Sequence, residues 1–404
     1  MKILLSAFAF SPILGSECGV GWNWALQLAK KHKVTVLTHA WFRTDVEAFL
    51  QQHPVANLQV EYFHVAPIKG AFKRSHLDSQ VYYAWWQIKV LAFARTLHAR
   101  EQFDLVHHLT WGTFRYPSWL GFLGPRFVVG PLGGGERAPW RLFKDVPVKQ
   151  RFKEVLRDVV VWSFKLDPLT QWAWSRADKV FCRTDETASV MPRRMAGRLA
   201  VVNEIGAPPV VPRSAPVVQK GRTHFLFAGR LLAWKGSQLA LEAVVQAIRR
   251  GADVSLTIVG DGDLHDLLHQ RILAQGVSDR VSLRARIPQA DLMSLYHQAD
   301  AFLFPSMHDS GGNVVLESLS RGLPVICLDL GGPKHFIHDG CGVVVSTQGL
   351  SHADLVSRLA DEVVKFAKLN DRQRQSLHDA AIAQAAKLTW EHQVKQVYGV
   401  LADD

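Results

Sequence analysis

The sequence predicts an α/β protein with two domains, each built around a parallel, doubly wound sheet. Three observations support this fold class. Apolar runs of strand length alternate with amphipathic segments of helical spacing in both halves of the chain. The alternation stops once, in a proline-rich stretch, and then starts again. The length of 404 residues suits two domains of ordinary size.

The first half opens with an apolar run over residues 3–10, followed by a turn that contains Pro12 and Gly15. With Lys2 before it and small residues near its end, this run imitates a secretory signal. We interpret it as a buried strand, because a doubly wound sheet begins with an apolar run and a glycine-containing turn before a helix. An amphipathic helix is predicted over residues 21–32. Further strands of the first half are predicted over residues 34–39, 58–65, 103–108, 126–130, 179–184 and 199–206.

The proline-rich stretch, residues 207–221, has no helical spacing and predicts a linker between a first domain, 1–206, and a second domain, 222–387. A last helix with an apolar stripe, residues 388–401, could close the second domain or return to the first. Ligands of open α/β sheets bind beyond the carboxyl ends of the strands, so functional residues are expected there. In the second domain, strands are predicted over residues 223–230, 254–262, 281–287, 301–306 and 323–330, and helices over 236–250, 264–275, 289–298 and 314–321.

The composition narrows the possible partners and the cellular setting. The formal net charge of +11 favours anionic partners: nucleic acid, acidic lipid or phosphorylated small molecules. No apolar run is long enough to cross a bilayer. The chain has no C-x-x-C motif, which argues against a disulfide framework and a zinc site and fits a reduced, cytoplasmic setting. The scattered cysteines are Cys18, Cys182, Cys327 and Cys341.

After the predicted strand 301–306, one carboxylate precedes a glycine pair and another follows it. Gly311 and Gly312 precede a predicted helix, whose first N–H groups and positive dipole end form a site for an anion such as a diphosphate. Asp309 lies on the loop and Glu317 about one turn into the helix, and carboxylates accept hydrogen bonds from hydroxyl groups. The pattern suits a polyol on each side of the phosphates. The alternative is a helix cap with a solvated glutamate.

Two cations follow the first strand of the second domain. Arg230 ends that strand and Lys235 lies in the loop before the next helix, where both could neutralise a diphosphate. Taken alone, they could equally be surface charges.

Two further loops also follow strands. The run VGDGD, with Gly260 and Gly262, imitates a D-x-D metal motif; we interpret it as a turn whose backbone passes near a ligand, because a metal ion needs more oxygen ligands than this loop offers. The backbone of Arg286 and Ile287, before the helix started by Pro288, could meet a planar base.

Together, the motifs GR-x4-KG, VGDG, RIP and DSGGNVVLES resemble those of the retaining glycosyltransferases of family 4, which have the GT-B fold. The stretches GSECGVGWNWALQLAKKHKVTVLT, FDLVHHLTWGTFRYPSW and VVGPLGGGE are similar to a subgroup associated with surface polysaccharide assembly. The resemblance covers essentially the whole chain. It implies two Rossmann-like domains facing across a cleft, with residues 388–404 crossing back to the first domain. It also implies a UDP- or GDP-sugar donor bound mainly by the second domain, with no cofactor and no metal ion.

The resemblance implies a role for each motif residue. Arg230 and Lys235 would hold the diphosphate and stabilise its charge as it leaves, and Glu317 would receive the ribose hydroxyls. Asp309 matches the first acid of the E-x7-E motif and would hold hydroxyls of the donor sugar, although the family usually has Glu there and Asp reaches less far. The other implied donor contacts are Gly19, Gly21, Gly229, Gly260, Gly262, Arg286, Ile287, Ser310, Gly311, Gly312, Asn313 and Val314.

The first domain would bind the acceptor. Gly19 and Gly21 match the family's glycine loop after the first strand, where a helix can face phosphate. The family often has H-x-H after the DLVH strand; here His107 matches the first histidine and is the better candidate for a residue that faces the cleft, with His108 second. The alternative is one buried, hydrogen-bonded histidine and one incidental one. Residues expected to line the acceptor side, or else to form a structural turn, are Gly133, Gly134, Gly135 and Glu136.

The reaction implied is glycosyl transfer with retention at the anomeric carbon. Asp309 and Glu317 are not the nucleophile and acid of a retaining hydrolase, because both would face the donor. The resemblance implies a front-face attack in which the leaving phosphate takes the proton of the acceptor. Domain closure would exclude water and limit hydrolysis of the donor.

Two basic and aromatic stretches, residues 71–100 and 141–158, suit an anionic membrane face, and the acceptor could then be a lipid-linked sugar at the inner leaflet. The alternative is a long helix with a solvated basic face and a buried aromatic stripe. The first stretch mixes Lys73, Arg74, Lys89, Arg95 and Arg100 with Tyr82, Tyr83, Trp85 and Trp86.

Rival functions are a nucleotide-sugar epimerase, a phosphorylase and a nucleic-acid-binding protein. An epimerase needs acid–base residues around the sugar, and a phosphorylase needs a lysine for pyridoxal phosphate; the sequence marks neither. The basic charge prompts the third rival, but no recognised nucleic-acid module is present.

Overall fold

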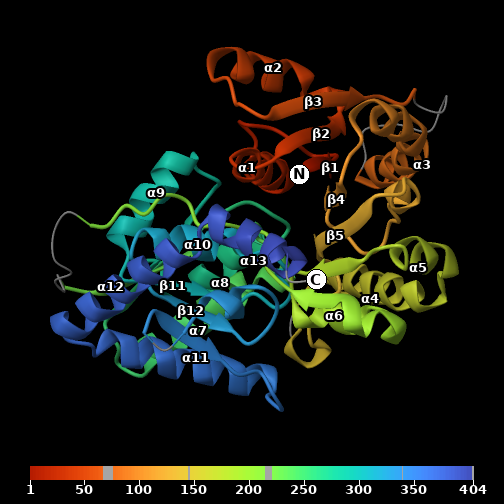
Figure 1. The fold of residues 1–404 in the computed structure, drawn as a ribbon. Helices are drawn as coiled ribbons and strands as arrows, with labels where there is room; N and C mark the ends of the chain where they lie inside the picture. Colours follow the sequence, from red (N-terminus) through yellow and green to blue (C-terminus); the bar gives the residue numbers. More distant parts are fainter. Residues whose placement is uncertain (67–75, 144–145, 214–220, 339, 403–404) are drawn as a thin grey trace. The chain divides into compact units, whose positions relative to one another are not determined.

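The computed structural model describes residues 1–66, 76–143, 146–213, 221–338 and 340–402, and the chain within it divides into two compact units (Figure 1). Unit 1 contains Met1–Gly135, Asp158–Glu204 and Trp390–Asp404. Unit 2 contains Glu136–Arg157 and Ile205–Thr389. Each unit is built on its own parallel sheet, as the alternating pattern predicts.

Unit 1 has a seven-stranded, wholly parallel sheet with the order β3-β2-β1-β4-β5-β6-β7. The reversal of order between β1 and β4 marks it as doubly wound. The strands lie where the apolar runs predict them, although most end earlier because their last residues form the connecting loops. They are β1 (Lys2–Ala7), β2 (Lys33–His39), β3 (Leu58–Phe63), β4 (Leu105–Thr110), β5 (Arg126–Leu132), β6 (Lys179–Cys182) and β7 (Leu199–Val201).

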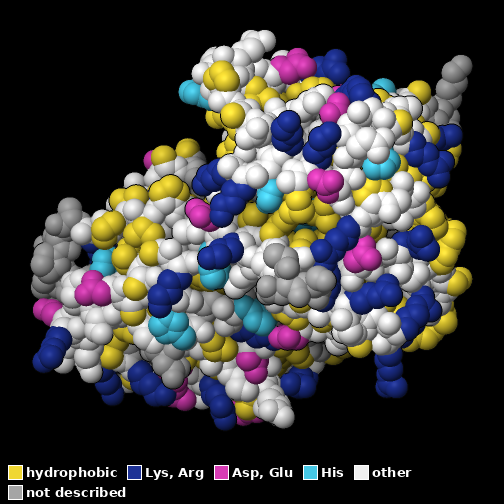
Figure 2. All heavy atoms as spheres, viewed as in Figure 1, with side chains coloured by type: hydrophobic (Ala, Val, Ile, Leu, Met, Phe, Trp, Pro, Cys, Tyr) yellow, Lys and Arg dark blue, Asp and Glu magenta, His cyan; other side chains and the backbone are white. Residues whose placement is uncertain are grey.

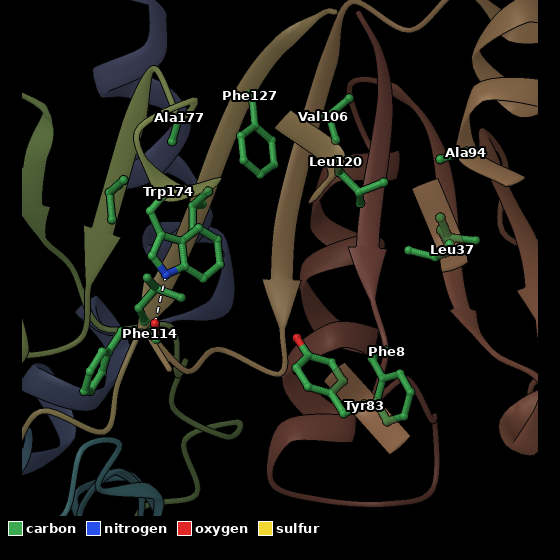
Figure 3. Close-up of a cluster of buried hydrophobic side chains, with 14 of the residues drawn as sticks. Phe8, Leu37, Tyr83, Ala94, Val106, Phe114, Leu120, Phe127, Trp174 and Ala177 are labelled. Atoms are coloured by element: carbon green, nitrogen blue, oxygen red, sulfur yellow. Dashed lines mark hydrogen bonds between the residues drawn. The ribbon is translucent and has the colours of Figure 1, made fainter. Parts of the chain in front are cut away.

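The core of unit 1 combines aliphatic side chains with many aromatic ones (Figure 3). Trp174 is fully buried and its indole N–H donates to Phe114 O at 2.8 Å, so the polar atom of this large side chain is satisfied. Tyr82, Tyr83 and Trp86 of helix α3 (His76–Glu101) are buried in the same core. The aromatic stripe of residues 71–100 therefore faces inward, and its proposed membrane role is wrong for these side chains. Lys73 and Arg74 lie outside the described residues.

The last helix, α13 (Trp390–Ala402), belongs to unit 1 and packs against α1 (Glu17–Ala29). Tyr398 Oη lies 3.0 Å from His107 Nδ1, and Arg126 donates to Leu401 O at 2.7 Å. The predicted return of the C-terminal helix to the first domain is confirmed. The other helices that lie wholly in unit 1 are α2 (Arg43–Gln52), α3 (His76–Glu101), α5 (Pro168–Trp174) and α6 (Asp185–Val190).

Unit 2 has a six-stranded parallel sheet with the order β10-β9-β8-β11-β12-β13. Because parallel crossovers are right-handed, the reversal between β8 and β11 puts helices on both faces; α7 packs against α11, and α10 against α12. The strands are β8 (Thr223–Ala228), β9 (Val254–Val259), β10 (Val281–Arg284), β11 (Ala301–Phe304), β12 (Val325–Leu328) and β13 (Gly342–Val345). The helices are α7 (Ser237–Arg249), α8 (His265–Ala274), α9 (Gln289–Gln298), α10 (Asn313–Ser320), α11 (His352–Ala367) and α12 (Asp371–Lys387).

The division into units differs from the predicted domains in one segment. Residues Glu136–Arg157, which include the first part of α4 (Val148–Ser163), cluster with unit 2. Arg141 donates to Thr347 O at 2.8 Å, and His352 Nδ1 lies 2.9 Å from Leu142 O. The described part of the predicted linker also lies against unit 2, since Val211 N donates to Ser320 O at 2.9 Å; residues 214–220 lie outside the described residues.

Candidate functional site

The candidate donor site lies at the carboxyl ends of β8 and β11, the two strands between which the order of the second sheet reverses. Crevices at such a reversal are where open α/β sheets bind ligands, because the flanking loops diverge there. The loop after β8 carries Arg230 and Lys235, and the loop after β11 carries Asp309 and Gly312. Residues placed together by sequence reasoning therefore come from neighbouring strands.

Lys235 and Asp309 form an ion pair that joins these two loops, with side chains only 14% and 16% exposed. Burial alone would raise the pKa of Asp309, but the Lys235 ammonium and the Gly312 N–H outweigh it, so the pKa lies below its usual value. The backbones are joined as well, because Met307 N donates to Trp234 O at 2.8 Å. The ammonium is thus held at a fixed place above the sheet.

Trp234, which sequence reasoning missed, lies close to both cations. Its ring centroid is 4.5 Å from Lys235 Nζ and 5.9 Å from Arg230 Cζ, distances at which cations are attracted to an aromatic face. The Trp234 ring also stacks on the His308 ring, with 4.2 Å between the two centroids. A tryptophan beside the lysine of the GR-x4-KG motif is a usable signal for this arrangement.

Gly311 and Gly312 lie at the start of α10, as predicted. Gly312 caps the helix with φ +83°, a conformation that favours glycine, and a Cβ at Gly311 would lie 2.5 Å from Ile205 Cδ1. Asn313 and Val314 begin the helix. The neighbouring residue Ser310 lies in the same loop.

A second glycine pair supports the first. Gly331 and Gly332 follow β12, and a Cβ at either would overlap a backbone oxygen of the loop that holds Asp309 and Ser310. Gly332 N donates to Asp309 O at 2.7 Å. Sequence reasoning missed this pair, although two glycines directly after a buried strand were the available signal.

Glu317 lies on α10, where Tyr296 Oη of α9 donates to its carboxylate at 3.3 Å. Burial raises the pKa of Glu317, while hydrogen bonds from Gln289 and Tyr296 act against this shift. The half-buried carboxylate is held by hydrogen bonds, unlike the solvated glutamate of the helix-cap alternative.

The other predicted donor loops have structural reasons for their glycines. A Cβ at Gly260 would overlap Gly229 O, and one at Gly262 would lie 2.6 Å from Leu231 O. The glycines let the loops after β8 and β9 pack backbone on backbone, which explains them without a ligand. Their role in donor binding, and that of Gly229, stays a prediction.

The acidic residues of VGDGD are occupied by the protein. Asp261 accepts from Arg286 N at 3.1 Å, which fixes the loop that contains Ile287, and Asp263 lies 3.2 Å from Lys153 Nζ. Among the described residues, no three His, Cys, Asp or Glu side chains gather as a metal site requires. These contacts agree with a turn at this position.

In unit 1, both histidines of the DLVHH strand are fully buried. His107 Nε2 donates to Gly130 O at 2.7 Å and its Nδ1 accepts from Tyr398, while His108 Nε2 lies 3.3 Å from Tyr83 Oη. Burial lowers the pKa of His107 to about 4 and that of His108 to about 3. The prediction that one of them faces the cleft is wrong, because a doubly wound sheet is covered on both faces.

Gly19 and Gly21 lie inside α1, which begins at Glu17, and not in a loop before it. A Cβ at Gly21 would lie 2.5 Å from Ala9 O, so this glycine lets the helix approach the end of β1. The prediction of a glycine loop at Gly19 and Gly21 is therefore wrong, because these glycines lie within the helix and serve its packing.

The glycine run after β5 forms a turn. Gly133 N donates to Gly112 O at 2.8 Å, Gly134 has φ +101° and Gly135 N donates to Thr187 Oγ1 at 3.1 Å. Glu136 is buried, with Arg157 donating to its carbonyl oxygen. These contacts match the structural-turn alternative.

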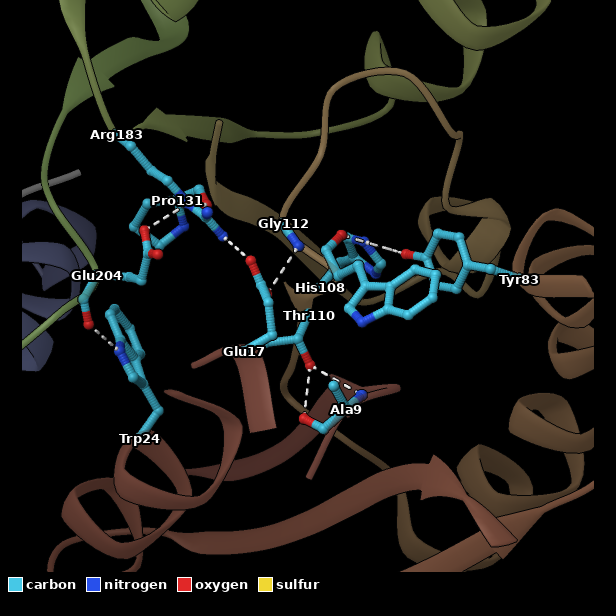
Figure 4. A network of polar contacts seen from close by, with 11 residues as sticks. Ala9, Glu17, Trp24, Tyr83, His108, Thr110, Gly112, Pro131, Arg183 and Glu204 are labelled. Carbon is cyan, nitrogen blue, oxygen red and sulfur yellow. Dashed lines mark hydrogen bonds and ion pairs between the residues drawn. The ribbon is translucent and has the colours of Figure 1, made fainter. Parts of the chain in front are cut away.

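A buried charge network that sequence reasoning missed lies at the carboxyl edge of the first sheet (Figure 4). Arg183, directly after β6, pairs with Glu17 at 2.7 Å and with Glu204 at 2.5 Å. Glu204 O also accepts from the Trp24 indole at 2.8 Å. Two carboxylates around one guanidinium leave a net negative charge, and the Glu17 side chain is 29% exposed. No spacing in the sequence links these three residues.

Residues 213–380 match the family described as Glycosyl transferases group 1. This stretch is a group 1 glycosyltransferase domain. The match holds the loops after β8, β9, β11 and β12, so the candidate donor site lies wholly within the group 1 domain.

Curated relatives of the chain are glycosyltransferases. It is 32% identical over 143 residues to alpha-D-kanosaminyltransferase of Streptomyces kanamyceticus, covering 35% of this chain and 37% of that protein. It is 30% identical over 177 residues to the lipopolysaccharide core biosynthesis glycosyltransferase LpsE of Rhizobium meliloti, covering 44% and 47%. The chain thus spans less than half the length of these curated relatives.

Solved structures resemble the whole chain. Anabaena Alr3699/HepE in complex with UDP and glucose has a TM-score of 0.61 at 17% identity, with full coverage of both chains. The lipopolysaccharide outer core galactosyltransferase WaaB has a TM-score of 0.61 at 15% identity and covers 100% of this chain and 99% of its own. At these identities the likeness concerns the fold, and the predicted GT-B fold is confirmed.

Proposed function

We propose that this protein transfers a hexose, with retention of configuration, from a UDP- or GDP-sugar to a saccharide or lipid-linked acceptor in the assembly of surface polysaccharide or glycolipid. The observation that carries the proposal is the Lys235–Asp309 pair between the two loops at the strand reversal. Arg230 Cζ lies 5.9 Å from the Trp234 ring centroid, and the Gly312 N–H is hydrogen-bonded to Asp309. Cations and backbone donors at this place suit a diphosphate.

The ion pair suggests how the donor is received. A diphosphate carries more charge than one carboxylate, so it competes with Asp309 for the Lys235 ammonium. Once displaced, Asp309 can accept hydrogen bonds from hydroxyls of the donor sugar, while Glu317 accepts from the ribose. Preorganised cations that meet the charge of the leaving diphosphate lower the barrier, typically by roughly 3–4 kcal/mol for each donor.

Retention through a front-face attack fits the partners of the carboxylates. Asp309 is paired with Lys235, and Glu317 accepts from Tyr296. Neither is a free carboxylate placed as a nucleophile, so the leaving phosphate is the group assigned to take the proton of the acceptor.

The relatives support the donor and acceptor classes. The Anabaena structure holds UDP and glucose, and LpsE and WaaB are named for lipopolysaccharide core synthesis. We assign a nucleotide-sugar donor and a saccharide acceptor to this chain by that likeness. The reaction needs no metal ion in this proposal, because the cations of the protein neutralise the diphosphate.

The proposal includes peripheral binding to an anionic membrane through α4. No described helix combines the length and apolarity that a membrane span requires. Instead, α4 exposes an apolar stripe at helical spacing, with Phe152 67% and Trp162 55% exposed. Lys149 and Arg151 flank the stripe on the exposed surface, and Figure 2 shows lysine and arginine side chains over the region where Figure 1 places α4. The remaining exposed apolar side chains of the helix are Val148, Val155, Leu156, Val159 and Val160.

Flotation with liposomes tests the membrane part. The wild-type chain is expected to float with vesicles that contain phosphatidylglycerol, and the Phe152→Glu variant is expected to remain in solution. Equal binding of both proteins, or binding of neither, contradicts the assignment of α4.

A donor panel tests the reaction. Purified protein is incubated with UDP- and GDP-sugars, with and without saccharide acceptors, and released nucleotide and products are measured. Acceptor-dependent release of UDP or GDP supports transfer. Conversion of the sugar without an acceptor favours an epimerase, and salt-dependent binding of DNA or RNA without response to any nucleotide sugar favours a nucleic-acid-binding protein.

A further inference from the structure

The first part of α4 contacts three of the loops that build the candidate donor site. Gln150 Oε1 accepts from Ala233 N at 2.8 Å in the loop after β8. Lys153 lies 3.2 Å from Asp263 in the loop after β9, and Glu154 lies 3.1 Å from His308 Nε2 in the loop after β11. Lys153 and Glu154 follow Gln150 by three and four positions, so one face of a single helix reaches all three loops. The helix comes from the first half of the sequence, outside the group 1 domain match.

Of the two contacts between charged or ionisable side chains, the one made by Glu154 is the more buried. Glu154 is 8% and His308 7% exposed, and burial lowers the pKa of His308, which favours the neutral ring. Nε2 faces the Glu154 carboxylate at 3.1 Å, a close polar contact whose angle falls outside that of a hydrogen bond. His308 in turn stacks on Trp234, with 4.2 Å between ring centroids and 22° between planes. Trp234 is the ring close to Lys235 and Arg230.

We infer that Glu154 is a positioning residue for donor binding: it holds the His308 ring against Trp234 and thereby fixes the surface on which Lys235 and Arg230 meet the diphosphate. The inference rests on the proposed function and adds a residue outside the family motifs to its machinery. If the His308 ring could rotate, the Trp234 ring stacked on it could move as well. Lys235 and Arg230 would then lose a fixed contact with Trp234. Glu154 touches neither donor nor acceptor in this arrangement and acts through His308 alone.

The test measures nucleotide affinity by calorimetry with UDP and with GDP, using the full chain and whichever nucleotide the wild type binds. Glu154→Ala is expected to weaken binding about tenfold, equivalent to about 1.4 kcal/mol. Glu154→Gln keeps a polar side chain of the same size beside His308 and is expected to restore affinity to within about threefold of wild type, or about 0.65 kcal/mol. Lys165→Ala, at an exposed position shortly after the same helix, is the matched control and should bind as the wild type does.

A double variant separates positioning from general destabilisation. If Glu154 acts through His308, the Glu154→Ala, His308→Ala double variant binds no more weakly than the weaker single variant, whereas independent effects multiply. Affinity within threefold of wild type in a folded Glu154→Ala variant, with Lys235→Ala defective, overturns the inference and leaves the proposed function intact. A wild-type chain that binds neither UDP nor GDP overturns both.

Discussion

Replacing Lys235 by alanine is the sharpest perturbation of the candidate site, because it removes a cation assigned to the diphosphate and also the partner of a buried carboxylate. The Asp309 side chain is only 16% exposed. With no ammonium beside it, Asp309 keeps the Gly312 N–H but loses the charge that lowers its pKa. The variant should therefore be both less active and less stable, for two different physical reasons.

The two effects have different sizes. Loss of a preorganised group that stabilises developing charge lowers kcat by roughly a hundredfold to a thousandfold. Breaking a buried ion pair costs about 3–5 kcal/mol, and we expect about 3 kcal/mol here because the Lys235 and Asp309 side chains keep 14% and 16% exposure. The lowered pKa of Asp309 stabilises the folded chain above the carboxyl pKa of the unfolded chain, and this stabilisation is lost as pH falls through the folded-state value. The stability difference between wild type and variant should therefore shrink in acid.

Turnover is measured by release of nucleotide, and stability by urea unfolding at neutral and acidic pH. The matched control is the double variant Lys235→Ala, Asp309→Asn, which leaves no buried charge. It should regain most of the lost stability and none of the activity. Near-normal turnover of folded Lys235→Ala would refute the assignment of this residue, and a double variant as unstable as the single one would refute the account of the ion pair.

Three further predictions follow from the same geometry. Glu317→Gln should weaken donor binding. Because the pKa of Glu317 is raised in the folded chain, ionising this group costs stability as pH rises, so the melting temperature of the variant should exceed that of wild type by a margin that grows between pH 4 and pH 8. A margin that stays constant with pH contradicts this prediction. Gly331→Ala (φ +68°) should lower the free energy of unfolding, measured in urea, by about 1–3 kcal/mol. The loss should exceed that of Gly349→Ala (φ +72°), whose added Cβ meets open space, and equal losses would show that overlap with Asp309 O is unimportant. Transfer should persist in excess EDTA, and a loss that Mg²⁺ or Mn²⁺ reverses contradicts metal independence.

The sequence is most informative where chain order alone brings residues together. Arg230 with Lys235 and Asp309 with Gly312 follow strands that the alternating pattern marks clearly, and a parallel sheet places the ends of all its strands at one edge. Their meeting needs only the order of the strands. Local patterns therefore predict both sheets and the central pair of loops.

Other residues depend on contacts that no spacing encodes. His107 and His108 alternate along β4, but the sheet is covered on both faces, so alternation does not separate a buried from an exposed side. The glycines of α1 look like a loop because glycine weakens helices, whereas Gly21 is required by the nearby Ala9 backbone. In α4 the apolar stripe faces outward and Glu154 inward, the reverse of the usual burial pattern.

These contacts divide the second unit into loops to which donor binding is assigned and elements that hold those loops. The chemistry is assigned to the loops after β8 and β11. The loop after β9 packs against the loop after β8 through Gly260 and Gly262. The loop after β12 packs against the loop after β11 through Gly331 and Gly332. Helix α4 contacts the loops after β8 and β11 through Gln150 and Glu154. Because cations must meet a diphosphate without reorganisation to stabilise its leaving charge, rigidity of the loops matters as much as their charge. Substitutions in the supporting elements should therefore lower turnover even though their side chains touch no substrate.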